Sequence, residues 1–155
     1  MSTLKPGSKV PDFALPMSGG GSWRLRDAAG KKLVIYFYPR DLTSGCTRES
    51  QDFRDRHRAF GKVATAIVGI SRDSVASHDK FAAKESLPFP LLADTDEGVC
   101  KLFDVIKQKT LYGRKYLGIE RSTFLLDAAG RLQQEWRNVK VPGHAEAVLE
   151  AAQRL

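Results

Sequence analysis

The amino-acid sequence predicts an α/β fold with a mixed sheet, and three patterns support this prediction. A continuous apolar run over residues 33–38 is typical of a strand buried on both faces. From residue 46 to residue 60, apolar side chains recur at steps of four and three, as in an amphipathic helix. A β-rich run over 63–70 and a helical pattern over 75–85 continue the alternation. Alternating strands and helices favour a parallel β-α-β core.

The second half of the chain completes the sheet. Residues 87–93 predict a short strand, which their prolines confine to a sheet edge. Residues 123–126 and 131–136 flank a turn that ends at Gly130, a residue able to adopt a positive φ, and so predict an antiparallel hairpin. This hairpin makes the expected sheet mixed. A final helix is expected over 144–155.

Length, cysteine count and hydropathy limit the kind of protein. The 155 residues suit a single domain that spans residues 1–155. Two cysteines, Cys46 and Cys100, exclude a Cys-x-x-Cys pair and a disulfide framework, and such sparse cysteine suits a reducing cytosol. The amino-terminal residues lack the apolar segment of an export signal, and no apolar run approaches the roughly 18 residues of a membrane span. We therefore expect a cytoplasmic protein without a membrane partner.

The loop between the predicted buried strand and the first amphipathic helix carries a reactive pattern. Pro39 lacks an N–H and ends the strand, while Thr43 or Ser44 can cap the helix. Gly45 allows a close approach to the backbone, and Cys46 falls in the first helical turn, where the helix dipole favours a thiolate. A single cysteine is more often a small buried hydrophobe. The Thr43 hydroxyl, three residues before the sulfur, instead favours a reactive site.

Pro39, Thr43 and Cys46 form the pattern Pro-x-x-x-Thr-x-x-Cys after a Tyr-Phe-Tyr strand, and this pattern resembles that of the peroxiredoxins. Further segments resemble, in order and spacing, the bacterioferritin comigratory protein (PrxQ) subfamily over nearly the whole chain: Val10-Pro-Asp-Phe-Ala-Leu15, the Gly-Cys-Thr-x-Glu of 45–49, Leu91-Leu-Ala-Asp94 and Gly118-Ile-Glu-Arg-Ser-Thr-Phe-Leu-Leu-Asp127. The resemblance implies a thioredoxin fold with an added N-terminal β-hairpin, expected over 13–16 and 22–25. It also implies a thiol-dependent peroxidase that reduces hydrogen peroxide and organic hydroperoxides.

The resemblance gives Cys46 the role of the peroxidatic cysteine, which attacks the terminal peroxide oxygen and becomes a sulfenic acid. It implies that Thr43, together with backbone N–H groups near Gly45 and Cys46, hydrogen-bonds the peroxide. Such displacement needs a thiolate, hydrogen bonds to both oxygens and positive charge near the leaving oxygen. Pro39 would shield the thiolate from water.

Two charged residues are expected to complete this site. Arg121 matches the arginine of the subfamily pattern Gly-Ile-x-Arg-Ser-Thr-Phe and would place a permanent positive charge beside the sulfur and the peroxide. Glu49 is expected to orient Arg121 through a bidentate pair. Alternatively, Glu49 is only a favourable charge in the first turn of the helix.

The chain departs from the subfamily in its second cysteine. Many relatives place a resolving cysteine five residues after the peroxidatic one, where this chain has Gln51, and others place it on the next helix, where 81–84 contain none. Cys100 is the only internal candidate, and its apolar neighbours favour a structural role over a resolving one. We therefore expect a 1-Cys cycle in which thioredoxin, glutaredoxin or a small thiol reduces Cys46.

Other functions remain as alternatives. A thiol–disulfide oxidoreductase on the same fold is disfavoured because Glu49 stands where the partner cysteine would be. A peroxide sensor would use the same pocket and is left open. A monomer or a weak homodimer is expected.

Neither the histidines nor the excess of basic residues predicts a further ligand. His57, His78 and His144 share no spacing, so we expect them on helix surfaces and expect no metal and no cofactor. The net charge of +7 is concentrated over 101–121, with six basic and two acidic residues. This stretch alone could contact nucleic acid, but without a nucleic-acid-binding fold we expect a loop flanking the peroxide pocket and no nucleic-acid partner.

Overall fold

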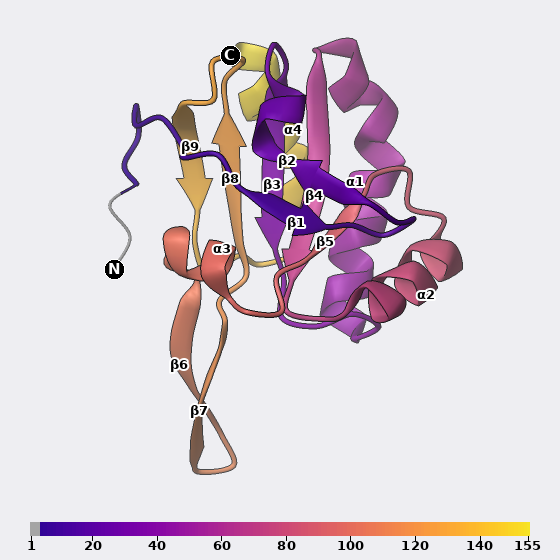
Figure 1. Ribbon diagram of the computed structural model, residues 1–155, viewed down its shortest axis with the longest axis vertical. Helices are drawn as coiled ribbons and strands as arrows, with labels where there is room; N and C mark the ends of the chain where they lie inside the picture. The colour runs from indigo at the N-terminus through magenta and orange to yellow at the C-terminus, as the bar shows by residue number, and fades with distance from the viewer. Residues whose placement is uncertain (1–3) are drawn as a thin grey trace.

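A five-stranded sheet forms the centre of the structure, a computed structural model that describes residues 4–155 (Figure 1). In chain order the elements are β1 (Ala14–Pro16), β2 (Ser22–Arg24), the 3-10 helix η1 (Leu25–Ala28), β3 (Lys32–Phe37), α1 (Ser44–Lys62), β4 (Thr65–Ser71), α2 (Val75–Glu85), β5 (Leu91–Ala93), α3 (Gly98–Leu102), β6 (Ile106–Leu111), β7 (Arg114–Ile119), β8 (Ser122–Leu126), β9 (Leu132–Trp136) and α4 (His144–Arg154).

The sheet is mixed, as predicted. Its strand order is β5-β4-β3-β8-β9, with β3 at the centre. β3 pairs in parallel with β4 and antiparallel with β8, while β5 and β9 occupy the two edges. The prediction of an edge strand within 87–93 is therefore confirmed. Because β3 is covered on both faces and paired on both sides, its carboxyl end holds the following loop in a defined place.

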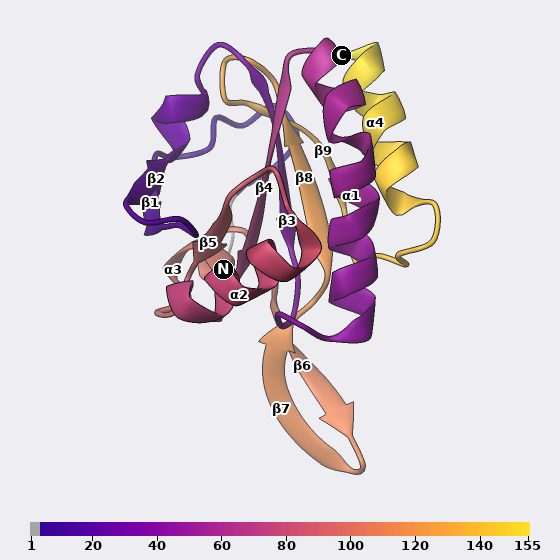
Figure 2. The same ribbon diagram turned by 90° about the vertical axis from the view of Figure 1, so that its right-hand side faces the viewer.

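The two faces of the sheet are covered differently. Figure 2 shows α1 and α4 on one side and the β1-β2 hairpin, η1 and α3 on the other. Successive residues of β3 alternate between two apolar clusters: Tyr36 packs in the cluster that contains Phe53 of α1, and Phe37 in the one that contains Phe103. The two cysteines follow this division, since Cys46 lies in the first cluster and Cys100 in the second. The sheet therefore separates them.

Helix α1 carries the predicted reactive loop at its amino end. It begins at Ser44 and continues through Gly61 to Lys62, two residues beyond the last apolar position of the predicted helix. Thr43 occupies the N-cap position with extended backbone angles, but its hydroxyl forms no capping hydrogen bond. Instead, Thr43 Oγ1 donates to the carbonyl oxygen of Arg40 at 2.8 Å. The hydroxyl is thus used within the loop that precedes the helix.

The basic stretch over 101–121 is not a loop. Most of it forms the antiparallel hairpin β6-β7, in which Lys109 is opposite Tyr116 (Figure 1). The hairpin projects from the body of the molecule in both ribbon views. The sequence does not predict these strands, because their residues are largely exposed and form no apolar run. The two hairpins that were expected, β1-β2 and β8-β9, are both present.

Two of the three histidines are buried, so the prediction of surface histidines is wrong for His78 and His144. Each has polar partners that replace water: Nε2 of His144 shares a hydrogen bond of 2.7 Å with Thr123 Oγ1, and Nε2 of His78 lies 2.9 Å from the Leu92 carbonyl oxygen. Burial, together with a smaller effect from the charge of Arg121, lowers the pKa of His144 to about 4. His144 is therefore neutral near pH 7.

Within residues 4–155, no group of histidine, cysteine and acidic side chains has the arrangement of a metal site. None of the helices in this part of the chain combines the length and the apolar character needed to cross a membrane.

Candidate active site

Cys46 lies in the first turn of α1, and its side chain is almost completely buried, with 1% exposed. Arg121, the residue immediately before β8, reaches across to it, and its Nη2 donates to Cys46 Sγ at 3.5 Å. Helix α1 and β8 are far apart in the sequence but meet because both pack next to β3. The guanidinium and the positive end of the helix dipole together favour negative charge on the sulfur. The structure therefore brings together the two groups that thiolate chemistry needs.

Gly45 explains how Arg121 comes so close. A Cβ atom at position 45 would lie 3.1 Å from Arg121 Nη2, which is tighter than an ordinary contact. A side chain at this position would push the guanidinium away from the sulfur. Gly45 thus permits the close approach that the sequence suggested, with the arginine as the approaching group.

Glu49 holds the guanidinium from its other side. Arg121 Nη1 donates to Glu49 Oε1 at 2.7 Å, and the Glu49 side chain is 1% exposed. The pair is not bidentate, which corrects the expected geometry: Glu49 Oε2 has no hydrogen-bond partner among the described residues. The second guanidinium nitrogen is instead used on Cys46. Arg121 therefore bridges a buried carboxylate and the sulfur.

Burial raises the pKa of Glu49 to about 7, against the charge and hydrogen bond of Arg121, which lower it. A carboxyl group with a raised pKa in the folded state holds its proton where the unfolded chain has lost it. Near neutral pH, Glu49 thus changes between a neutral and a charged partner of Arg121. When it is protonated, less of the positive charge of Arg121 is offset.

This pKa predicts a pH-dependent contribution to stability. Below the unfolded pKa of about 4.5 the contribution of Glu49 is complete, and it is lost as the pH rises to about 7. Replacing Glu49 with glutamine should remove this loss. We expect the difference in unfolding free energy between wild type and Glu49→Gln to change by roughly 1–3 kcal/mol between pH 4.5 and pH 8 in urea titrations. If the unfolding free energies of the two proteins changed in parallel with pH, the raised pKa of the buried Glu49 would be contradicted.

An open hollow adjoins this arrangement on the side of the β6-β7 hairpin. It has a volume of about 300 Å³, and its lining includes Pro39, Arg121, Lys107 and Lys109. The basic stretch therefore flanks the site, as expected, although as a hairpin. Burial lowers the pKa of Lys109, and so does the nearby charge of Arg121. Lys109 was not among the expected site residues, because only the hairpin brings it to the same hollow as Arg121.

Cys100 has a different environment. Its side chain is fully buried, and its backbone N–H donates to Asp94 Oδ2 at 2.6 Å at the start of α3. Burial raises the pKa of the Cys100 thiol, and Asp94 raises it further. A thiol that resists ionisation is a poor nucleophile. These features fit the structural role expected for Cys100. The two cysteines belong to apolar clusters on opposite faces of the sheet, and the helices that carry them, α1 and α3, lie on opposite sides of it (Figure 2).

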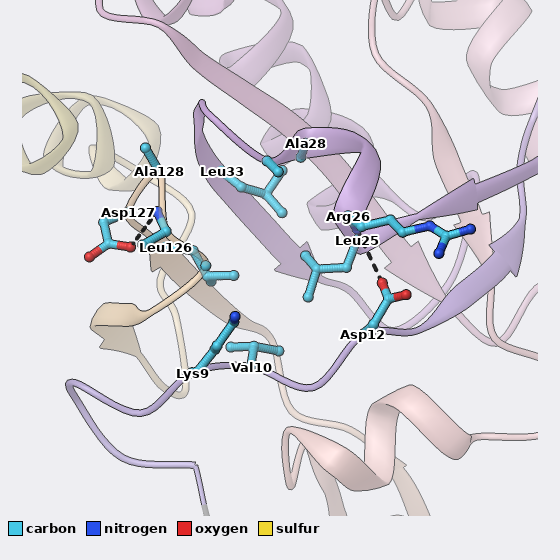
Figure 3. A pocket seen from close by; sticks show the side chains of 13 residues that line it. Lys9, Val10, Asp12, Leu25, Arg26, Ala28, Leu33, Leu126, Asp127 and Ala128 are labelled. Atoms are coloured by element: carbon cyan, nitrogen blue, oxygen red, sulfur yellow. Dashed lines mark hydrogen bonds between the residues drawn. The ribbon is translucent and has the colours of Figure 1, made fainter.

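A second hollow, of about 250 Å³, lies on the Cys100 side of the sheet between the amino-terminal segment, η1 and the β8-β9 turn. Figure 3 shows apolar side chains such as Val10, Leu25 and Leu33 lining it. Asp12 at its rim already accepts a hydrogen bond from the backbone N–H of Arg26 at 3.1 Å. Neither cysteine lines this hollow, and it offers no group for the chemistry of Cys46.

Comparison with known proteins shows which family this chain resembles. The model of the AhpC/TSA family matches residues 6–135. Peroxiredoxin Bcp of Xanthomonas campestris pv. campestris is 56% identical over 140 residues, which cover 90% of this chain and 88% of that protein. The chain belongs to the Bcp family of peroxiredoxins. Peroxiredoxin Bcp of Bacillus subtilis is 48% identical to this peroxiredoxin and covers 96% of it, with 94% of its own length matched.

Solved structures of Bcp peroxiredoxins have the same fold. The bacterioferritin comigratory protein of Xanthomonas campestris superposes with a TM-score of 0.90 at 50% identity, covering 99% of this chain and 98% of that one. PrxQ of Xylella fastidiosa gives a TM-score of 0.94 at 42% identity, with the same coverage. The expected thioredoxin fold is thus confirmed. This peroxiredoxin is a thiol-dependent peroxidase, an enzyme of the oxidoreductase class that acts on peroxides with thiols as reductants.

Proposed function

We propose that Cys46 is the peroxidatic cysteine of this enzyme. The observation that carries the proposal is the 3.5 Å contact from Arg121 Nη2 to a sulfur placed at a helix amino end beside an open hollow. The thiolate forms a bond to the terminal peroxide oxygen while the O–O bond breaks. Cys46 becomes a sulfenic acid, and the leaving hydroxide or alkoxide takes up a proton to give water or an alcohol.

Each of the surrounding residues has a separate role in this step. Arg121 stabilises first the thiolate and then the charge that develops on the leaving oxygen. The backbone N–H groups at Gly45 and Cys46 donate to the peroxide oxygens. The Thr43 hydroxyl, whose own proton is donated to the Arg40 carbonyl oxygen, accepts from the peroxide O–H. Pro39, which lines the hollow, limits the access of water to the sulfur. Glu49 touches Arg121 rather than the substrate and acts as its positioning residue.

We propose that both hydrogen peroxide and organic hydroperoxides are substrates. The hollow beside Arg121 is open and has room for an organic substituent. The related bacterioferritin comigratory protein of Xanthomonas campestris is described as reducing alkyl peroxides. Comparing kcat/KM for hydrogen peroxide with that for cumene hydroperoxide and tert-butyl hydroperoxide measures this range directly. Consumption of hydrogen peroxide alone would contradict it.

We also propose a 1-Cys cycle. The positions that carry resolving cysteines in relatives have none here: the Gln51 side chain donates to Glu85 Oε1 at 2.7 Å, and 81–84 begin with the fully buried Phe81 and end with the exposed Lys84. The sulfenic acid would therefore react with an external thiol, releasing water and forming a mixed disulfide. A second thiol would then release the Cys46 thiol. Thioredoxin, glutaredoxin or a small thiol would serve as the reductant, with thioredoxin as the first candidate.

Mass spectrometry after one equivalent of peroxide, with and without a sulfenic-acid trap such as dimedone, tests this cycle. The expected product is a Cys46 sulfenic acid adduct, with no internal disulfide. A Cys46–Cys100 link would instead show a 2-Cys cycle, and a linked dimer would show resolution between two chains. Turnover with thioredoxin, glutaredoxin and dithiothreitol, each in excess, then identifies the reductant.

Replacing Cys100 with alanine tests the same proposal through turnover. We expect Cys100→Ala to keep kcat within about twofold of wild type with an external thiol, because the opposite face of the sheet gives Cys100 no access to Cys46. The loss of buried volume should lower the unfolding free energy by about 1 kcal/mol. Loss of thiol-supported turnover in a folded Cys100→Ala protein would show instead that Cys100 resolves the sulfenic acid.

We further propose that residues 1–155 form one domain, since both apolar clusters are built on the same sheet. A cytoplasmic location and a monomer or weak homodimer follow from the same chemistry, because the cycle needs a reducing compartment and uses no second chain. Sedimentation at several concentrations measures the oligomeric state. A stable dimer with Cys46 linked between chains after oxidation would contradict this part of the proposal.

A further inference from the structure

A buried polar cluster beneath the Cys46 loop has no role in the chemistry described so far. It joins Asp41, in the loop between β3 and α1, to His78 of α2. Asp41 Oδ2 lies 2.7 Å from His78 Nδ1, and the two side chains are 2% and 0% exposed. Asp41 also accepts hydrogen bonds from the hydroxyls of Tyr38 at 2.5 Å and Ser77 at 2.8 Å. Burying such groups is costly, so the cluster needs an explanation.

Hydrogen bonds fix the orientation of both side chains. His78 Nε2 lies 2.9 Å from the Leu92 carbonyl oxygen, which can only accept, so this nitrogen carries a proton. The Asp41 carboxyl group accepts from two hydroxyls as well as contacting His78 Nδ1, so both of its oxygens are hydrogen-bonded. The arrangement is therefore a buried aspartate–histidine pair whose polar atoms all have partners. Two further charged residues lie at this end of the loop: Arg40 directly precedes Asp41 in the chain, and Asp73 Oδ2 accepts from the Asp41 backbone N–H at 2.8 Å.

The residue after Asp41 shows what the pair holds. Leu42 has a φ of 66°, in the left-handed region, and its side chain is 49% exposed. This conformation is unfavourable for a residue other than glycine, asparagine or aspartate, and it persists only where the surrounding structure enforces it. Leu42 has little packing of its own to enforce it. The next residue is Thr43, and Cys46 follows one helical turn later. The left-handed turn at Leu42 therefore sets the direction in which α1 begins.

We propose that Asp41 and His78 are positioning residues of the peroxidase reaction. The pair ties the strained turn at Leu42 to α2 and thereby holds Thr43 and Cys46 opposite Arg121. The inference rests on the proposed role of Cys46. It assigns to α2 a function that its sequence did not suggest, because the contact joins residues 37 positions apart.

The experiment compares Asp41→Ala with wild type in two measurements that folding alone does not control. One is the second-order rate of Cys46 oxidation by hydrogen peroxide. The other is the pH at which Cys46 alkylation by iodoacetamide reaches half its maximal rate. We expect the oxidation rate to fall about 10- to 100-fold and the half-maximal pH to rise, because small misplacements of reacting groups are costly. Circular dichroism confirms that the variant is folded.

Gln51→Ala provides the matched control. Gln51 also connects α1 to α2, through its hydrogen bond to Glu85, but it does not hold the loop at Leu42. We expect this control to lower the unfolding temperature and to leave the half-maximal pH of alkylation unchanged. An equal shift in the control, or no shift in Asp41→Ala, would overturn the proposal.

Two further variants keep the proposal falsifiable if Asp41→Ala does not fold. His78→Asn keeps a donor near Asp41 but loses the bond to Leu92, so we expect a smaller fall in the oxidation rate, about threefold to tenfold. Adding Leu42→Asn to His78→Asn should raise the rate of Cys46 oxidation at least about threefold above that of His78→Asn alone, because asparagine tolerates the left-handed conformation. Absence of recovery would show that the pair does not act through Leu42. If Cys46→Ser kept peroxidase activity, the assignment of Cys46 itself would fail, which is a separate outcome.

Discussion

Cys46→Ser is expected to lower kcat/KM for hydrogen peroxide by at least about 1,000-fold. A serine hydroxyl is not ionised near pH 7, and neither Arg121 nor the helix dipole can lower its pKa enough to make it a nucleophile. In the variant, Arg121 Nη2 can donate to the serine oxygen in place of the sulfur, so the variant should fold like wild type. The loss is therefore chemical and does not reflect unfolding.

The measurement is peroxide decay with dithiothreitol in excess, so that the reductant does not limit turnover. Cys100→Ala is the matched control, since it removes the only other cysteine of the chain. We expect the control to retain activity while Cys46→Ser loses it. Full activity in a folded Cys46→Ser protein would refute the proposed site.

Arg121→Ala should have the second largest effect, lowering kcat/KM by about 100- to 1,000-fold. The guanidinium contacts Cys46 with one nitrogen and Glu49 with another, so alanine removes both interactions together. It also leaves the buried Glu49 without its partner, which should raise the Glu49 pKa further and lower the unfolding free energy by about 3 kcal/mol. Arg121→Lys should be intermediate, because one ammonium group cannot reproduce this bridge.

A double variant separates the two effects. In Arg121→Ala/Glu49→Gln the unpaired buried carboxyl group is gone, so most of the lost stability should return in urea unfolding. The activity should stay low, since the charge beside the sulfur is still missing. Recovery of activity together with stability would show that Arg121 serves the fold and not the reaction.

Much of the fold could be predicted because its signals are local. The run over 33–38 predicts β3, and the apolar spacing after Cys46 predicts α1. The β6-β7 hairpin was missed because its residues are largely exposed and form no apolar run. The surface placement of His78 and His144 was wrong for a related reason: their partners, Asp41 and Thr123, are distant in the sequence.

The candidate site divides in the same way. Pro39, Thr43, Gly45 and Cys46 lie within eight residues, so a short segment carries their pattern. Arg121 lies 75 positions after Cys46, and only the resemblance to a family connected the two.

By itself, the sequence determined the α/β class, the reactive loop and the absence of cysteine from both usual resolver positions. These properties depend on residue type, local spacing and helix periodicity. The tertiary structure decided which groups meet. It placed Arg121 between Glu49 and Cys46, Lys109 in the lining of the hollow beside Arg121, and Cys100 on the face of the sheet opposite Cys46. The physical reason is that strand pairing in the sheet brings together segments that are far apart in the chain. Burial then shifts the pKa of the ionisable side chains in the interior, as it does for Glu49.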